Sequence, residues 1–384
     1  MLETQKLYEE DPYLRTFRAR VLSCEREKHG WAVVLDRTAF FPEGGGQPGD
    51  LGVLDRVNVL DTRERGDEVV HLTDAPLPVG SQVTGGIHWP LRHQHMQEHT
   101  GEHILSGVLH RFFGVTNVGF HMGSACVTLD LDKPLEPRQI ALGERLANEA
   151  VWRDLPVLVS YPTQAELETL DYRSKKEIAG QVRIVTIPGY DVCACCGTHV
   201  AHTGEIGMVK VLDSMHYKGG VRISMVCGRR AFADYGQKLA AVSAISGQLS
   251  AKPEAVADAV THLLEEKEHL QQQLHAAQDH LVTVLAESVQ PLPNGWACAF
   301  AEGLAPDALR RFALSLAEKA PNAAVLSGDG QHWQYALATK DGDLRAVCKE
   351  MNAAFQGRGG GKPGLVQGSL QSDPETLEAW FAKR

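Results

Sequence analysis

A run of histidines near residue 100 is the densest group of chemically competent side chains in the sequence. His95, His99 and His103 are spaced four residues apart, so on a helix they fall on one face. Two imidazoles at positions i and i+4 can converge on one metal ion. The spacing leaves both pairs open, His95 with His99 and His99 with His103, and a solvated histidine-rich helix face is the alternative interpretation.

A second group of possible ligands lies much further along the chain. Cys193, Cys195 and Cys196 stand close together and are followed by His199. Thiolate and imidazole donors suit zinc, which prefers four nitrogen or sulfur ligands in a tetrahedral arrangement. The two groups together predict one zinc site, although the three cysteines compete for one or two ligand positions.

The histidine segment also allows a different reaction. From His99 to His103 the sequence fits H-x-x-E-H, the inverted zincin pattern, in which Glu102 would be the general base. This pattern predicts a zinc metallopeptidase. It gives the cysteines around Cys195 no role, which counts against it.

Successive glycines before Gln47 mark a further region of interest. Gly44, Gly46 and Gly49 formally match the dinucleotide fingerprint G-x-G-x-x-G, but Pro48 and the residues after it do not open the helix that such a site requires. Successive glycines instead let a backbone approach a ligand closely or adopt positive φ angles. An ordinary hairpin connection is the alternative.

The secondary structure expected around these motifs divides the chain into four parts. Short strands separated by Gly, Pro and Asp predict a small glycine-rich β-barrel over residues 1–90. Residues 91–235 alternate between helices and strands, with a helix that ends at Gly114, which predicts a mixed α/β domain holding the zinc site. Residues 236–290 are helical, and a second α/β unit follows over 291–384. The fold class is therefore α/β and β, multi-domain.

The helical part carries a heptad pattern. Apolar residues from Val256 to Val284 recur at alternating spacings of four and three, interrupted by Lys267. Such a seam packs against another helix, either in a helical hairpin within one chain or in a coiled coil between two chains. A homodimer through residues 250–290 is thus one of two expected arrangements.

Composition restricts the class of protein further. The chain has 384 residues with 38 Lys and Arg against 48 Asp and Glu, a net charge of -10. This charge excludes a surface that is basic throughout but not a local nucleic-acid patch. No apolar run approaches the roughly 18–20 residues that a membrane helix needs, and the N-terminus lacks the features of a secretion signal. We therefore expect a cytoplasmic protein without a membrane partner, in which thiols stay reduced.

Taken in order, the motifs resemble the editing domain of alanyl-tRNA synthetase in its free-standing form, the AlaX proteins. The motifs that carry the resemblance are Thr38–Asp50, His99-x-x-x-His103, Cys195–Val200, Thr203–Gly207, Lys218–Arg222 and Cys227-Gly228. The heptad segment and the glycine-rich loop Gly357–Gln367 resemble the C-terminal domain of the synthetase, so the chain is similar to the long AlaX form.

The resemblance implies an aminoacyl-tRNA deacylase that hydrolyses the ester of Ser-tRNA(Ala) or Gly-tRNA(Ala). Its metal ligands carry over to His99, His103, Cys195 and His199. Cys196 stands where the family usually has glycine, so it is an alternative thiolate. A tRNA-binding protein without turnover is a further alternative. No stretch long enough for an aminoacylation domain precedes this region, so we do not expect the chain to charge tRNA.

The resemblance also suggests roles for the glycine-rich segment. Gln47 and the backbone of Gly44, Gly45 and Gly46 are expected to hold the terminal adenosine or the aminoacyl group. Thr38 is expected to recognise the serine hydroxyl, because size cannot exclude the smaller alanine and a hydrogen-bond partner can. Zinc could activate water or polarise the ester carbonyl. Four protein ligands leave open whether one of them is displaced or the ion only positions the substrate.

Recognition of tRNA(Ala) requires a surface outside the small ester pocket. Because phosphate contacts supply much of the affinity for nucleic acid, an acidic chain needs a local basic patch. We expect this patch within residues 291–384, beside the glycines 359 to 361. Its candidate residues are Arg310, Arg311, Lys319, Arg358 and Lys362.

Overall fold

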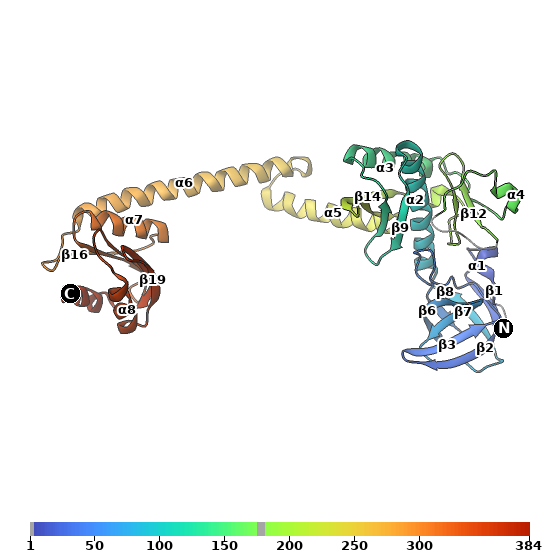
Figure 1. The fold of residues 1–384 in the computed structure, drawn as a ribbon, viewed down its shortest axis with the longest axis horizontal. Helices are drawn as coiled ribbons and strands as arrows, with labels where there is room; N and C mark the ends of the chain where they lie inside the picture. Colours follow the sequence, from blue (N-terminus) through green and yellow to red (C-terminus); the bar gives the residue numbers. More distant parts are fainter. Residues whose placement is uncertain (1–3, 175–180) are drawn as a thin grey trace. The chain divides into compact units, whose positions relative to one another are not determined.

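The computed structural model describes residues 4–174 and 181–384, which form two compact units, 1–242 and 243–384 (Figure 1). The expected mixed α/β, multi-domain class is confirmed. The finer division into four parts stays a prediction, and the short element expected at Lys175–Ile178 lies outside the described residues. Within the described ranges, no helix combines the length and apolarity needed to cross a membrane.

The first unit begins with a closed barrel, where the sequence predicts a small one. Its strands follow one another around the barrel in the order β2-β3-β7-β6-β5-β8, and β8 pairs with β2 to close it. Alternate residues of β2, such as Phe17, Ala19 and Val21, point into the core, as expected for a half-buried strand. The bounds are β2 Thr16–Glu27, β3 Gly30–Leu35, β5 Gly52–Leu54, β6 Val57–Arg65, β7 Glu68–Thr73 and β8 Gln82–Ile87.

A short N-terminal segment lies against this barrel. Strand β1 (Gln5–Lys6) pairs in parallel with β4 (Arg37–Thr38), and α1 (Leu7–Glu10) follows β1. The glycine-rich segment comes between β4 and β5. Thr38, in β4, and Gln47 therefore both lie between the barrel strands β3 and β5.

Helix α2 (Trp89–Phe113) leads from the barrel into the second half of this unit, beside α3 (Pro137–Trp152) (Figure 1). It ends at Gly114, which has the left-handed conformation (φ 63°) typical of a helix C-cap. Most of α2 is buried, and Ile104, Leu105 and Leu109 pack in its core. At Gly101, a Cβ atom would lie 2.4 Å from Cys227 Sγ, so glycine lets the helix approach the neighbouring sheet.

Two sheets surround α2. One is antiparallel in the order β14-β15-β10-β9, and the other has the order β11-β12-β13 and leads directly into the cysteine segment. Helix α5 (Gly228–Leu249) follows them. The remaining bounds are β9 Asn117–Met122, β10 Val127–Leu131, β11 Leu158–Ser160, α4 Gln164–Leu167, β12 Ile184–Ile187, β13 Asp191–Ala194, η1 Thr203–Ile206, β14 Val209–Tyr217 and β15 Gly220–Cys227.

The second unit contains the long helix α6 (Val256–Ser288) and a sheet in the order β16-β17-β18-β20-β19. Successive residues of β17 alternate between two cores: Val325 packs with α7 on one face, and Leu326 packs with α8 and α9 on the other. The bounds are η2 Pro253–Ala255, β16 Trp296–Ala301, α7 Pro306–Ala317, β17 Asn322–Gly328, β18 His332–Thr339, α8 Arg345–Ala354, β19 Arg358–Lys362, β20 Leu365–Gln371 and α9 Pro374–Ala382.

The glycine-rich stretch of this unit is a strand, so its prediction as a loop is wrong. Residues 358–362 form β19, which pairs antiparallel with β20. A Cβ atom at Gly359 would lie 2.4 Å from both the Gln367 carbonyl oxygen and the Tyr335 hydroxyl. Glycine at this position therefore permits the close approach of β19, and the missing side chain hides the strand signal in the sequence.

The heptad residues of α6 are exposed in the single chain. The helix packs against α7 through a different face, which includes Gln278, Val282 and Ala286. Leu270 and Leu274, which belong to the heptad seam, have 56% and 55% of their surface exposed. The seam therefore remains available to a second helix.

Candidate metal centre

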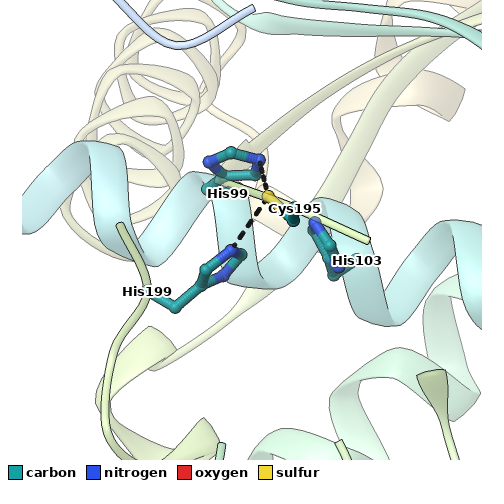
Figure 2. A group of neighbouring side chains, drawn as sticks. All are labelled: His99, His103, Cys195 and His199. Carbon is teal, nitrogen blue, oxygen red and sulfur yellow. Dashed lines mark hydrogen bonds between the residues drawn. The ribbon is translucent and has the colours of Figure 1, made fainter. Parts of the chain in front are cut away.

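Four side chains from two distant segments converge on one point in the first unit. Helix α2 presents His99 and His103 on successive turns, and the segment after β13 presents Cys195 and His199. One ligand atom from each of the four lies within 4.8 Å of the others. Cys195 Sγ is 3.5 Å from His99 Nε2 and 3.4 Å from His199 Nε2. Figure 2 shows the imidazoles arranged around this sulfur. The structure thus brings together the four residues that the resemblance implies.

The competing ligands lie outside this group. Cys196 is exposed, whereas Cys193 is buried and lies close to His103 and Asp191. His95 is buried on α2, and burial lowers its pKa to about 4. An α-helix turns about 100° per residue, so side chains eight positions apart point roughly 80° apart and only neighbouring members of the histidine series can converge.

The outer nitrogen of each ligand histidine has a hydrogen-bond partner. His99 Nδ1 lies 2.9 Å from Gln47 Oε1, His103 Nδ1 lies 2.9 Å from Asp191 Oδ2, and His199 Nδ1 lies 3.1 Å from Thr100 Oγ1. The Thr100 hydroxyl itself donates to the Met96 carbonyl, so it accepts from His199. In each ring the proton is therefore held on Nδ1, and the Nε2 lone pair is left for a metal.

Electrostatics favours an ionised sulfur in this centre. Burial alone would raise the pKa of the Cys195 thiol, but His99, His103 and His199 hold it well below its usual range. Burial lowers the pKa of His199 to about 3, so this ring is neutral at pH 7. Burial would lower the pKa of His103, but Cys195 and Asp191 hold it well above its usual value, so a metal that binds here displaces a proton from that ring. A thiolate with neutral imidazoles is the ligand form that binds a metal. Three nitrogens from buried histidines and one sulfur from the partly buried Cys195 fit zinc.

The glycine-rich segment lies beside this centre. Gly46 has a φ of +87°, and a Cβ atom there would lie 2.5 Å from the Phe120 carbonyl oxygen. The Phe120 ring in turn stacks on His99, with centroids 5.0 Å apart. Glycine at position 46 therefore lets the backbone reach β9 next to a metal ligand. Gln47 is fully buried beneath it.

Thr38 lies in the barrel core, where His71 holds its hydroxyl. Thr38 Oγ1 is 2.8 Å from His71 Nε2 and accepts from the Phe40 amide at 3.1 Å. Burial lowers the pKa of His71 to about 4, so the ring is neutral, and its Nδ1 donates to the Val33 carbonyl. His71 Nε2 must then accept from Thr38. The hydroxyl of Thr38, which is fully buried, can therefore act toward any further partner only as an acceptor.

Glu102, the general base of the peptidase interpretation, is fully buried on α2. One of its carboxylate oxygens accepts a hydrogen bond of 2.5 Å from Asn117 on β9. This contact joins the helix to the sheet. It gives Glu102 a structural partner besides any catalytic role.

The basic candidates of the second unit fall into two sets. Arg310 pairs with Asp307, Arg311 pairs with Asp279, and Lys319 donates to the Ala286 carbonyl at the end of α6. Arg358 and Lys362 instead lie exposed on β19, and no ion pair joins either of them to another described residue. Because side chains alternate along a strand, these two cations share one face with Gly360.

Sequence reasoning missed the residues that orient the ligands. Asp191, Thr100 and Arg173 carry no recognisable motif, although Asp191 lies only two positions before Cys193. Nothing in the spacing of the chain connects them with His103 or His199. Their roles depend on contacts between segments that are far apart in sequence.

The fold and the centre define a multi-domain α/β protein with a His–Cys group that could hold a metal, built from a long helix and a distant cysteine segment. Residues 182–224, which include Cys195 and His199, match the family described as Threonyl and Alanyl tRNA synthetase second additional domain. Residues 14–91 match the family tRNA synthetases class II (A).

Individual relatives make the likeness more specific. The chain is 29% identical over 391 residues to the alanyl-tRNA editing protein AlaX-L of Pyrococcus horikoshii, covering 97% of this chain and 96% of that protein. It is 34% identical over 225 residues to the mouse alanyl-tRNA editing protein Aarsd1, covering 54% of this chain and 55% of the relative. The alanine–tRNA ligase of Ignicoccus hospitalis is 28% identical over 388 residues, and the chain spans only 42% of its length. The resemblance to a long free-standing alanyl-tRNA editing protein is confirmed.

Proposed function

We propose that the protein is a cytoplasmic trans-editing hydrolase that deacylates Ser-tRNA(Ala), Gly-tRNA(Ala) or both, with zinc at His99, His103, Cys195 and His199. The observation that carries this proposal is the convergence of these four ligands beside the Gly44–Gly46 backbone. The names of AlaX-L and Aarsd1 support the reaction class.

The chemistry suits an aminoacyl ester. Such an ester is already activated, so its hydrolysis needs an oriented water and stabilisation of the developing oxyanion. A bound zinc would supply Lewis-acid polarisation or a water of lowered pKa. Because the chain offers four ligands, the ion either loses one of them when substrate binds or serves to position the substrate.

The surrounding residues would hold the substrate. In this proposal, the backbone of Gly44, Gly45 and Gly46 receives the terminal adenosine or the aminoacyl group. Gln47 fixes the end of that segment, because its amide contacts both His99 and Thr198. Thr38 would accept a hydrogen bond from the seryl hydroxyl, which alanine lacks, and the loss of that bond would discriminate against alanine.

The alternatives fit these observations less well. In a metallopeptidase of the H-x-x-E-H type, Cys195 and His199 would have no role, although both lie in the ligand group. A tRNA-binding protein without turnover would need no thiolate held by three histidines beside the glycine-rich segment. Deacylation assays separate the three functions directly.

Binding of tRNA is proposed for the exposed strand β19. Arg358 and Lys362 form no ion pair with any residue that the structure describes, and they lie on a face where Gly360 exposes the backbone. Nothing lies within 4 Å of a Cβ atom built at Gly360. Phosphate oxygens can approach such a surface closely. Arg310, Arg311 and Lys319 are weaker candidates, because acidic side chains or a carbonyl already engage them.

The exposed heptad seam of α6 favours a homodimer through residues 250–290. Leucines exposed along a helix at a/d spacing bury their surface when a second copy of the helix packs against them. Sedimentation velocity of the full chain tests this part of the proposal. Replacing Leu270 and Leu274 with glutamate should convert a dimer into a monomer, whereas a monomeric wild type would exclude the dimer.

The reaction itself is tested by incubating the protein with Ser-tRNA(Ala), Gly-tRNA(Ala) and Ala-tRNA(Ala), each with and without a chelator. We expect loss of the seryl or glycyl ester, sparing of the alanyl ester and inactivation by the chelator.

Cys195→Ala should lose zinc and activity. Its matched control, Cys196→Ala, removes the neighbouring exposed thiol and should keep both. Full zinc content in Cys195→Ala would overturn the ligand assignment.

A further inference from the structure

We propose that Asp191 is a positioning residue that fixes His103 as a metal ligand, and that Arg173 holds Asp191 in place. This inference rests on the proposed metal centre. It concerns the one ligand histidine whose outer nitrogen contacts a charged group: Gln47 and Thr100, the partners of His99 and His199, are neutral.

A chain of hydrogen bonds connects these residues. His103 Nδ1 lies 2.9 Å from Asp191 Oδ2, and the other oxygen, Oδ1, accepts from Arg173 Nε at 2.8 Å. Arg173 Nη2 donates to Ser106 Oγ at 2.9 Å. Ser106 lies on α2, one turn after His103. The chain of contacts therefore begins and ends on the same helix.

The backbone holds both members of the ion pair. Asp191 begins β13, and the Arg173 amide donates to the Val192 carbonyl, while the Ala194 amide donates to the Arg173 carbonyl. Gly107 makes room on α2, since a Cβ atom there would lie 2.9 Å from Asp191 Cβ. The carboxylate is thus confined before any metal binds.

The carboxylate of Asp191 is buried, so its stability depends on its hydrogen-bond and charge partners. The side chains of Asp191 and His103 are only 1% and 2% exposed. An isolated buried carboxylate would be unstable, so the Arg173 guanidinium and the His103 ring are needed to keep it ionised.

The consequence for the metal follows from the position of the proton. A carboxylate accepting from Nδ1 keeps the proton there and makes Nε2 a more basic ligand. Loss of the carboxylate would leave the His103 ring free to rotate or to change tautomer. Arg173 also lines a cavity of about 440 Å³ that contains Asp171, so the outer end of the contact chain borders that cavity.

The experiment compares Asp191→Asn with Asp171→Asn in the full chain. Asp171 lines the same cavity and is exposed, so its variant removes an equal charge without touching His103. Zinc affinity is measured by competition with a chromogenic chelator. Asp191→Asn should bind zinc about 10–100-fold more weakly, and Asp171→Asn should bind it like the wild type.

A second measurement needs no variant. In the zinc-loaded wild type, a long-range ¹H–¹⁵N spectrum of labelled histidine should show His103 as the Nδ1–H tautomer. Its Nδ1 proton should lie further downfield than those of His99 and His199, because a charged acceptor gives the stronger hydrogen bond. Equal zinc affinity in Asp191→Asn, or an Nε2–H tautomer for His103, would overturn the inference. A wild type that binds no zinc would instead overturn the proposed metal centre.

Discussion

The side-chain oxygen of Gln47 lies 2.9 Å from Nδ1 of His99. The same oxygen accepts from the Thr198 amide at 3.2 Å, and the Gln47 nitrogen donates to the Thr198 hydroxyl at 2.9 Å. One buried amide therefore joins the glycine-rich segment to both parts of the chain that supply the proposed metal ligands. The orientation of the Gln47 amide is fixed because its oxygen faces two donors, on His99 and Thr198, and its nitrogen faces one acceptor, the Thr198 hydroxyl.

Gln47→Leu should weaken zinc binding by about tenfold or more, because His99 loses the partner that fixes its tautomer. Chelator competition measures this affinity, and Thr198→Val serves as a control that removes one of the contacts of the amide without touching His99. If Gln47 acts only on the substrate, zinc affinity will stay unchanged and KM alone will rise.

Thr38→Val should lower activity on Ser-tRNA(Ala) more than on Gly-tRNA(Ala). One lost hydrogen bond is worth about 0.5–1.5 kcal/mol, so the ratio of the two kcat/KM values should shift roughly two- to tenfold. Thr38→Ser keeps the hydroxyl and should keep the ratio. Equal losses on both substrates, together with lower thermal stability, would mean that Thr38 serves only the barrel core.

His71 should make the barrel less stable in mild acid. Its pKa is lowered from 6.5 to about 4 in the folded chain, so below pH 6.5 the unfolded state binds a proton that the folded state does not. The free energy of unfolding is therefore unaffected by His71 above pH 6.5. Between pH 6.5 and pH 4 it falls by at most about 1.4 kcal/mol per pH unit. Hydrogen exchange of β3 and β7 at several pH values measures this loss.

The matched variant for this measurement is His71→Gln, which can still accept from Thr38 but does not titrate. The stability of its barrel strands should depend less steeply on pH between 6.5 and 4. His95, whose pKa is also lowered to about 4, is present in both proteins and cancels in the comparison. Parallel pH profiles would show that His71 is not the group responsible.

Replacing Arg358 and Lys362 together with alanine should weaken tRNA binding and flatten its dependence on salt. Each lost phosphate contact should reduce the steepness of a plot of log binding constant against log salt concentration by about one. The control replaces Arg310 and Arg311, which are paired with Asp307 and Asp279, and should change the slope less. An unchanged slope in the Arg358 and Lys362 variant would show that the tRNA-binding surface lies outside β19.

The sequence by itself determined the parts of the site that depend on local periodicity. Spacing of four residues places His99 and His103 on one side of a helix, and Gly114 ends that helix because it adopts a left-handed conformation. The short spacing from Cys195 to His199 likewise keeps thiolate and imidazole together. Such features follow from backbone geometry within a few residues.

Only the tertiary structure decided which of several equivalent residues take part. It brings Cys195 and His199 to His99 and His103 and leaves His95 outside the ligand group, and it exposes Cys196 while Cys195 is partly buried. It also brings Gln47 and Asp191 onto the outer nitrogens of His99 and His103. These contacts join residues far apart in the chain, and their geometry depends on how the barrel, α2 and β13 pack, which no local pattern encodes.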